Sequence, residues 1–329
     1  MFVSIGLRMK VEVEALNMVE PLGAYMKHRT VPLIKRVERG QERIGYRIVM
    51  APAISGQSIN NGYSRTLVDL ARAKNLPVCD ECKNYPARGG FTKRTTDNQL
   101  SFDKRVETCV VEDLTGFLAP NAGVRRTSPV MFSNMVPDIE HGKAMLDSQF
   151  HVRYNFESNK HDPFNVEIGS AVYMLSIAMN VDDIGRLSNG GYVSDRIERV
   201  KLAFKGLTAL IEGLGFGAKK ARYLPVYEVL SGVAAISSPL PFMVSKPKLY
   251  YGDKCYIEDT IERAQRYVRA LRDFGEQVKI FYFDREGAIR GSVQIQQGVK
   301  RLGSYTELIE ELLSEVVNYI SQQQQRRTS

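Results

Sequence analysis

The chain of 329 residues carries 45 Lys and Arg against 37 Asp and Glu, a formal charge of +8, with 43% hydrophobic and 25% charged residues. These fractions are typical of globular proteins, so they exclude whole-chain disorder, collagen and coiled coil. The length predicts one large domain or two small ones. The positive excess fits a partner with regularly spaced phosphates, although many basic proteins bind no nucleic acid.

The sequence also argues against targeting segments. Arg8 and Lys10 stand where a signal peptide needs its apolar core, and the longest apolar stretch, 171–181, is too short to span a membrane. We therefore expect a cytoplasmic protein without membrane contact. Four Cys in a chain of this length do not indicate a secreted disulfide framework, and we expect reduced thiols or metal ligands.

The first expected element is a strand. Hydrophobic and polar residues alternate from Val3 to Val13, which predicts one buried face and one wet, partly basic face. After a polar loop, two extended runs, 31–38 and 43–52, flank a turn that contains Gly40 and predict a hairpin. A helix over 55–74 follows, with its first residue, a Ser, as the cap.

In the middle of the chain, periodicity disappears between 77 and 105, which predicts an inserted, exposed segment. A short apolar element, 106–118, comes next. The strand at 149–156 alternates aromatic and β-branched residues, expected to pack, with His151 and Arg153 on the other side. A packed aromatic side opposite a His/Arg side is what an exposed binding sheet needs.

The last part of the chain alternates strands and helices. The expected elements are strand 173–181, helix 197–214, strand 224–236, helix 257–274, strand 278–284 and a helix from Ser304. We expect Arg196 and Arg199 on the polar side of the first of these helices. The Gln-rich tail, 321–329, is expected to be disordered. This order predicts an α+β fold with a ferredoxin-like core.

Basic clusters are the candidates for phosphate contact. One follows glycines 213, 215 and 217, whose spacing fits neither the Walker nor the dinucleotide pattern. For each cluster, a helix C-cap or a solvated charged turn is the alternative. We expect four clusters to line one continuous groove: 27–29, Arg125-Arg126, the His151/Arg153 face and 219–222.

Cys79 and Cys82 have the two-residue spacing of half a structural zinc site. Cys109, Cys255 or His141 are candidates for further ligands, but a second such pair is absent from the sequence. A disulfide or two surface thiols are the alternatives. Apart from this zinc, no cofactor is expected.

Seven short motifs, taken in chain order, resemble one family. They are Glu14-Ala15-Leu16-Asn17, Lys27-His28-Arg29-Thr30, Pro52-Ala53-Ile54-Ser55-Gly56, Val124-Arg125-Arg126-Thr127-Ser128, Gln149-Phe150-His151-Val152-Arg153-Tyr154, Phe164-Asn165-Val166-Glu167 and Ala221-Arg222-Tyr223-Leu224-Pro225. The sequence thereby resembles the backbone subunit of the archaeal type I-A CRISPR effector complex, Cascade. This is the Cas-seven family of the repeat-associated (RAMP) RNA-binding superfamily, also labelled DevR-type autoregulator.

The resemblance implies a single domain, 1–329, with a modified RNA-recognition-motif (RRM) palm and finger and thumb insertions at about 77–165. It implies a non-catalytic subunit that forms a helical filament along CRISPR RNA, beside other Cascade subunits, and presents the guide to target DNA. The residues expected along the RNA are Asn17, Lys27, His28, Arg29, Arg125, Arg126, His151, Arg153, Lys219, Lys220 and Arg222.

Two other functions stay open. Relatives in the same broad superfamily cleave RNA with a His, so a metal-independent endoribonuclease for repeat RNA would use His151 or His28 as base, with a Lys or Tyr nearby. The autoregulator label suggests a DNA-binding repressor, although no helix-turn-helix is evident in the sequence. Signatures of serine hydrolases, zincins and paired carboxylates are missing from the sequence.

Overall fold

The structure, a computed structural model, describes residues 1–19, 23–39, 43–87, 93–94, 99–290 and 298–328. Its main sheet consists of β1 (Phe2–Glu14), β2 (Tyr25–Met26), β7 (Val130–Phe132), β8 (Val136–Pro137), β9 (Met145–Asn155), β10 (Lys160–Asn180), β11 (Val226–Ser238), β14 (Gln277–Asp284) and β15 (Val299–Arg301). The strand order is β15-β14-β11-β1-β10-β2, and β7, β8 and β9 also pair with β10. Parallel and antiparallel pairs occur together, so the sheet is mixed.

β1 lies inside the sheet, and its alternating sequence forms the expected strand. It pairs antiparallel with β10 and with β11. Helix α5 (Arg196–Glu212) connects these two neighbours, so the three elements form a split β-α-β unit around β1. Only part of the face of β1 expected to be wet is buried by a second layer, because Lys10 and Glu12 keep 41% and 46% of their side chains exposed. Arg8 on this face is buried and donates from Nη1 to Asp138 Oδ2 at 2.7 Å.

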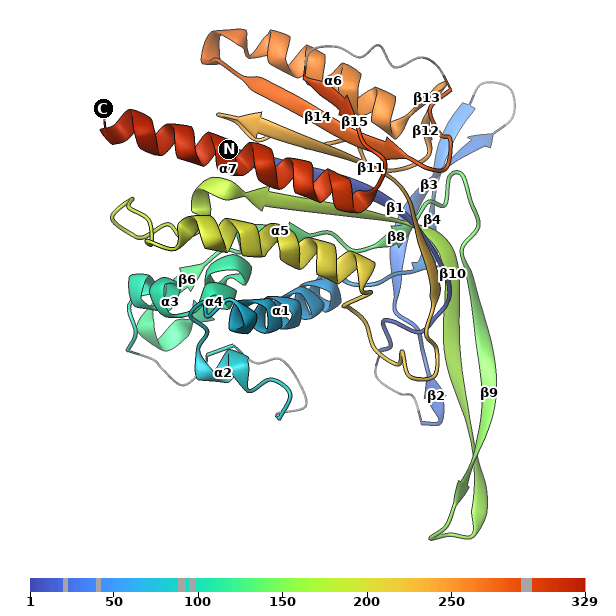
Figure 1. Ribbon diagram of the computed structural model, residues 1–329. Helices are drawn as coiled ribbons and strands as arrows, with labels where there is room; N and C mark the ends of the chain where they lie inside the picture. Colours follow the sequence, from blue (N-terminus) through green and yellow to red (C-terminus); the bar gives the residue numbers. More distant parts are fainter. Residues whose placement is uncertain (20–22, 40–42, 88–92, 95–98, 291–297, 329) are drawn as a thin grey trace.

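Helices cover both faces of the sheet (Figure 1). α1 (Gly56–Ala73), α5 and α7 (Tyr305–Thr328) pack on one face, and α6 (Tyr256–Ala270) packs on the other. The alternation of β14 shows this division, since Phe281 and Phe283 join the first core while Ile280 and Tyr282 join the second. All four expected helices are confirmed. The architecture is therefore mixed α/β around a central sheet.

The remaining elements are short. They are α2 (Asp80–Lys83), α3 (Phe102–Thr108), α4 (Val110–Thr115), β5 (Phe117–Ala119), a 3-10 turn at Pro120–Ala122, β6 (Val124–Arg126), a 3-10 turn at Val181–Asp183, β12 (Tyr250–Tyr251), β13 (Lys254–Cys255) and a 3-10 turn at Arg272–Phe274. The expected irregular insertion therefore contains α2 and part of α3, while 88–92 and 95–98 lie outside the described residues. In the described part of the chain, no helix has the length and hydrophobicity needed to cross a membrane.

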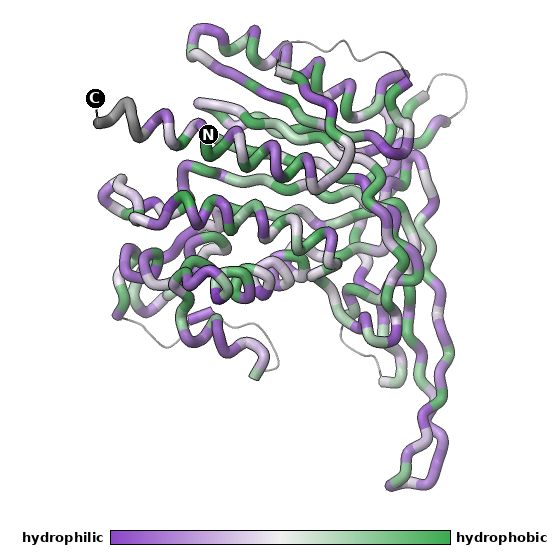
Figure 2. Tube along the Cα trace, viewed as in Figure 1, coloured by the Kyte–Doolittle hydropathy of each residue, from purple (hydrophilic) through white to green (hydrophobic). Residues whose placement is uncertain are grey.

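Two hairpins project from the helix-covered body (Figure 1). β3 (Thr30–Arg39) pairs with β4 (Arg43–Pro52) as expected, while the turn at Gly40 lies outside the described residues. β9 pairs with the N-terminal half of β10 in a longer hairpin. The aromatic side of β9, expected to pack, is exposed: Phe150 is 65% accessible, and Phe156, directly after β9, is 87% accessible. The hairpin extends beyond the helices, and Figure 2 shows hydrophobic segments continuing along it.

The C-terminal tail is helical where disorder was expected. α7 continues to Thr328, past Ile320, which is buried in the core. Gln and Arg are good helix formers, so a polar tail rich in them can propagate a helix that tertiary packing has already nucleated.

A buried carboxylate joins the corner formed by α4, α5 and β6. Arg199 of α5, expected on a solvated face, is 1% exposed and donates from Nη1 to Asp113 Oδ2 at 3.1 Å. Arg126 also pairs with Asp113, and the Gly185 amide donates to it. Arg196 is buried as well. These arginines therefore stabilise the fold at this corner.

We expect Asp113→Asn to destabilise the protein by about 3–5 kcal/mol, because it leaves two buried guanidinium groups without their carboxylate. Equilibrium unfolding in guanidinium chloride measures this loss. The control is Glu198→Ala, which breaks the exposed Lys201–Glu198 pair on α5 and is expected to cost at most about 1 kcal/mol. Equal losses in the two variants would contradict the assigned role of Asp113.

Candidate nucleic-acid interface

A pocket of about 270 Å³ lies about halfway along the β9–β10 hairpin. It is lined by His151, Phe164, Val166, Lys219, Ala221, Arg222 and Tyr223. The first three come from the hairpin, and the others come from the segment between α5 and β11. Two regions expected to contact RNA therefore meet in one place, although they are far apart in the sequence.

The pocket has an aromatic wall centred on His151. The His151 ring stacks on Phe164, which faces it across the hairpin, with ring centroids 5.2 Å apart and an interplanar angle of 25°. Tyr223 approaches His151 edge-on, and its hydroxyl hydrogen bonds to Nε2. Flat rings beside polar groups suit an unstacked nucleobase. Phe164 and Tyr223 were not among the expected RNA contacts, although both stand within the family-like motifs at 164–167 and 221–225.

Cations border this wall. Lys219 lies at positive φ of 54° and donates to Met26 Sδ at 2.8 Å, which places β2 and the residues after it beside the pocket. Partial burial and the neighbouring Arg222 lower the pKa of Lys219. Lys220 is directed elsewhere, because its Nζ donates to the Leu214 carbonyl at 2.6 Å. The glycines before these cations serve packing, since Gly213 ends α5 and Gly217, at φ of 83°, lies against Leu16. The helix C-cap alternative thus explains Gly213.

The 27–29 cluster is divided between surface and interior. Lys27 and Arg29 are exposed, and Lys27 Nζ lies 5.9 Å from the centroid of the Tyr25 ring. His28 points inward, where its Nε2 pairs with Glu14 Oε1 at 2.7 Å and both side chains are fully buried. The expectation that His28 contacts RNA or acts as a base is therefore not met by this geometry. Its imidazole holds the loop to β1 instead.

Burial and the ion pair act in opposite directions on His28 and Glu14. Burial lowers the pKa of His28, but the hydrogen bond and charge of Glu14 outweigh it, and the pKa lies above its ordinary value of 6.5. Burial raises the pKa of Glu14, but the hydrogen bond and charge of His28 lower it to below 4.5. Both groups are therefore held in their charged forms.

Three further expected contacts occupy other places. Asn17 is mostly buried, and its Oδ1 accepts the Ser55 amide at 2.7 Å, so it positions the start of α1. Arg125 is exposed on β6, which lies beside α3 and α4 and away from β9 (Figure 1). Arg126 is committed to Asp113. The prediction that one continuous groove includes Arg125-Arg126 is thus wrong, because β6 belongs to another corner of the fold.

Arg153 lies farther out along β9 than His151. Its side chain is exposed, and Nη2 lies 3.8 Å from Asp162 Oδ2 across the hairpin. The structure therefore gathers Lys27, Arg29, His151, Arg153, Lys219 and Arg222 around the β9–β10 hairpin. Cys79 and Cys82 lie outside this region, together with Cys109.

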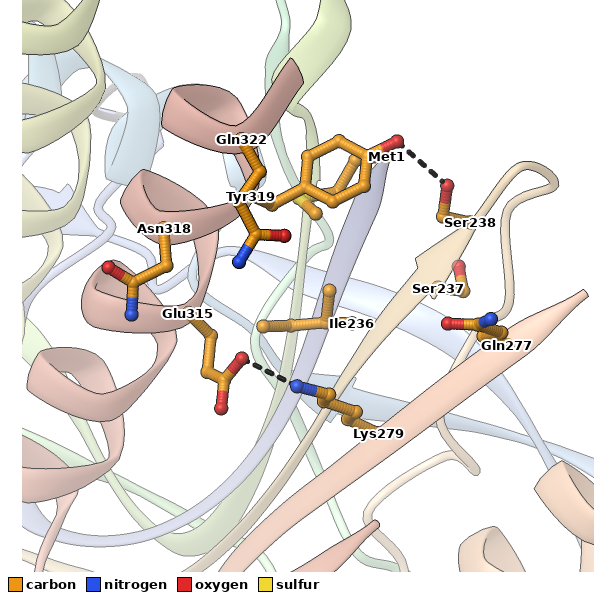
Figure 3. A pocket seen from close by; sticks show the side chains of 10 residues that line it. All are labelled: Met1, Ile236, Ser237, Ser238, Gln277, Lys279, Glu315, Asn318, Tyr319 and Gln322. Atoms are coloured by element: carbon orange, nitrogen blue, oxygen red, sulfur yellow. Dashed lines mark hydrogen bonds and ion pairs between the residues drawn. The ribbon is translucent and has the colours of Figure 1, made fainter. Parts of the chain in front are cut away.

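Another cavity, of about 200 Å³, lies between α7 and the ends of β11 and β14 (Figure 3). Two pairs of its polar side chains are in contact. Lys279 Nζ pairs with Glu315 Oε2 at 2.7 Å, and Ser238 Oγ lies 3.3 Å from the Tyr319 hydroxyl. These contacts join α7 to the sheet, and none of the residues expected to bind RNA lines the cavity.

Comparisons with known proteins agree on one family. The family model described as "CRISPR-associated negative auto-regulator DevR/Csa2" matches residues 5–261. Two proteins of Saccharolobus solfataricus are similar: "CRISPR-associated protein Cas7/Csa2 1" is 33% identical over 88% of this chain and 95% of its own length. "CRISPR-associated aCascade subunit Cas7/Csa2 2" is 31% identical over 95% and 100%. A solved chain from a "CRISPR RNA-guided surveillance complex" has a similar fold, with a TM-score of 0.55 at 14% identity over 96% of this chain and 99% of that chain.

The Glu14–His28 pair makes stability depend on pH. Because the folded-state pKa of His28 is raised, its stabilisation is fully present below pH 6.5 and is lost as pH rises through the raised value. Because the pKa of Glu14 is lowered, its contribution is present above pH 4.5 and is lost as pH falls through the lowered value. Both contributions are fully present between pH 4.5 and pH 6.5, so the pair stabilises the fold most strongly in that range.

We therefore expect His28→Gln to lower the melting temperature more at about pH 6 than at about pH 9. Thermal unfolding at both pH values, followed by circular dichroism, measures the difference. In a double-mutant cycle, Glu14→Gln should cost less stability once His28 is replaced than it does in the wild-type protein. A melting-temperature difference that does not change with pH would reject the charged pair.

Proposed function

The chain belongs to the CRISPR-associated DevR/Csa2 family, and from this premise we propose that it is a non-catalytic RNA-binding subunit. It oligomerises along CRISPR RNA, forms the backbone of an antiviral surveillance complex and presents the guide to target DNA. The observation that carries this proposal is the His151 pocket, where stacked rings and cations lie together on a projecting hairpin. A cytoplasmic location follows, since guide and target are nucleic acids of the cell interior.

The pocket chemistry favours single-stranded RNA. An unstacked base can stack on an aromatic wall whatever its sequence, and each such contact is worth about 1–3 kcal/mol. Lys219 and Arg222 line the same pocket and would offer charged donors to the phosphates on either side of that base. Specificity would rest on base pairing by the guide, because this arrangement recognises ring faces and phosphates.

Exposed hydrophobic faces support assembly with further copies and with other Cascade subunits. One face of the β3–β4 hairpin carries Ile34, Tyr46 and Ile48, each at least 66% exposed, and Ile34 pairs directly with Ile48. The outer part of β9 carries a second such set around Tyr154. Contiguous exposed apolar surfaces mark protein interaction sites. We place copies of this chain on them, in a helical filament.

The fold supports the finer architecture as a proposal. The split β-α-β unit of β10, α5 and β11 around β1 is the ferredoxin-like element of a modified RRM palm. The region 77–165, which includes α2, α3, α4 and β9, would then supply finger and thumb. In this architecture, residues 1–329 form a single domain.

One contact favours a second candidate function, a metal-independent endoribonuclease for repeat RNA. The Tyr223 hydroxyl bonds to His151 Nε2, and Lys219 lines the same pocket, which is a set of groups suited to acid–base catalysis. We favour binding, because the tyrosine occupies the nitrogen that a general base would direct at a 2′-hydroxyl. Stacking of the imidazole on Phe164 serves a recognition surface equally well.

Single-stranded RNA binding at several salt concentrations tests the pocket. Lys219→Ala should weaken binding and reduce the slope of log K against log salt by about 0.7, the value for one phosphate contact. His151→Ala should weaken binding by about 1–3 kcal/mol through lost stacking. Arg269→Ala, which removes an exposed cation from α6, is the matched control and should change neither quantity. Salt-insensitive binding, or equal effects of Lys219→Ala and Arg269→Ala, would reject the proposed interface.

A single-turnover incubation with repeat RNA, without divalent metal, separates binding from cleavage. We expect the wild-type protein to bind the RNA and release no product, because Tyr223 engages His151. Product formation that disappears in His151→Ala, while Tyr223→Phe retains binding, would establish the endoribonuclease instead. RNA length on a denaturing gel is the measurement.

A further inference from the structure

Three cysteines meet at the corner of α2, α3 and α4. These helices lie away from β9 (Figure 1). Cys79 precedes α2, Cys82 lies within it, and Cys109 stands at the junction of α3 and α4. Their sulfur atoms all lie within 4.8 Å of one another. Cys82 and Cys109 are fully buried, and Cys79 is half-buried. The backbone joins the two segments, since the Val110 amide donates to the Pro77 carbonyl at 2.9 Å.

The sulfur separation matches metal coordination. The sulfur atoms of Cys82 and Cys109 are 3.8 Å apart. Thiolates placed tetrahedrally at about 2.3 Å from zinc have sulfurs about 3.8 Å apart, whereas a disulfide bond is about 2.05 Å long. The separation therefore fits two ligands that share an ion and is too long for a disulfide bond. Cys79, at the spacing typical of zinc sites, supplies a third vertex.

Positive side chains border the thiols. Arg94 lies near Cys79, and its Nη2 lies 3.4 Å from Glu112 Oε2. Lys93 Nζ donates to the carbonyls of Thr115 and Gly116. Its ammonium group is also near enough to Cys82 and Cys109 to interact electrostatically with their thiolates. A zinc ion with three thiolates carries a net negative charge, which these two cations would balance in a largely buried place.

We propose that Cys79, Cys82 and Cys109 bind one zinc ion, with a water molecule as the fourth ligand on the half-buried side of Cys79. Soft thiolates select thiophilic ions such as zinc. Among the described residues, no His, Asp, Glu or further Cys joins this group, which leaves the fourth position to solvent. The ion fixes α2 to the α3–α4 junction, next to the corner that Asp113 holds together. Its role is structural, and it lies outside the RNA pocket.

Metal content of untagged protein, purified without chelator, tests the site. We expect about one zinc ion per chain by inductively coupled plasma mass spectrometry. The zinc X-ray absorption spectrum should show three sulfur neighbours at about 2.3 Å. Cys82→Ser and Cys109→Ser should each lose the metal, because even changes outside the ligand set shift metal affinity about 10–100-fold. Cys255→Ser, a buried cysteine of the α6 core, is the matched control and should keep the zinc.

A second measurement uses only the wild-type protein, in case the serine variants fail to fold. Modification of its thiols with an organomercurial should release zinc in proportion to the sulfurs blocked, as read by a chromogenic chelator. Zinc-free wild-type protein, a disulfide among the three cysteines by mass spectrometry, copper in place of zinc, or zinc retained by both serine variants would each overturn the proposal. These readouts are independent of RNA binding, so their failure leaves the proposed function untouched.

Discussion

A buried carboxylate at the end of β1 holds together the segments that build the candidate interface. Glu14 pairs with His28 and accepts a hydrogen bond from Tyr173 at 2.7 Å, so the loop after β1 and the strand β10 are both tied to it. Glu14 turns inward where the register of β1 shifts and Val13 adopts a φ of 56°, a strained value for a β-branched residue. Gly169 on β10 leaves the space, because a Cβ there would lie 2.8 Å from the Glu14 carboxylate. The strain at Val13 is thus offset by a charge that is paired and hydrogen-bonded, as a buried charge must be.

Glu14 also fixes the position of the segment that carries Lys219. The Leu16 amide donates to Glu14, and the Leu16 carbonyl accepts the Ala218 amide at 2.8 Å, directly before Lys219. Gly217 allows this approach, since a Cβ there would lie 2.7 Å from the Leu16 side chain. The segment after α5 is therefore held against the loop after β1, across about two hundred residues of sequence. These backbone contacts between uncharged groups bring the cations of two distant segments to the same part of the surface.

Periodicity predicted most elements, because alternation and helical spacing are local properties of the sequence. It did not predict which faces are covered. Arg8 of β1 and Arg199 of α5 are buried, and Asp138 and Asp113 pair with them from more than eighty residues away. The aromatic side of β9 is exposed because the hairpin extends beyond the helices, which strand alternation alone cannot reveal. Of the candidate site, the His151 and Lys219 regions were predictable from motifs. That these two regions meet in one pocket, and that His28 points inward, depends on tertiary contacts that the motifs do not show.

The two exposed apolar faces bear on the kind of assembly that the proposed function needs. A contact between identical patches is isologous and closes into a dimer, whereas a contact between different patches is heterologous and can continue into an open helix. The β3–β4 face and the outer part of β9 lie on different hairpins of one chain, so contact of the first with the second on a neighbouring copy would be heterologous. Growth would then have no symmetry limit of its own. A bound guide RNA, held at the His151 pocket of each copy, would set where the filament ends.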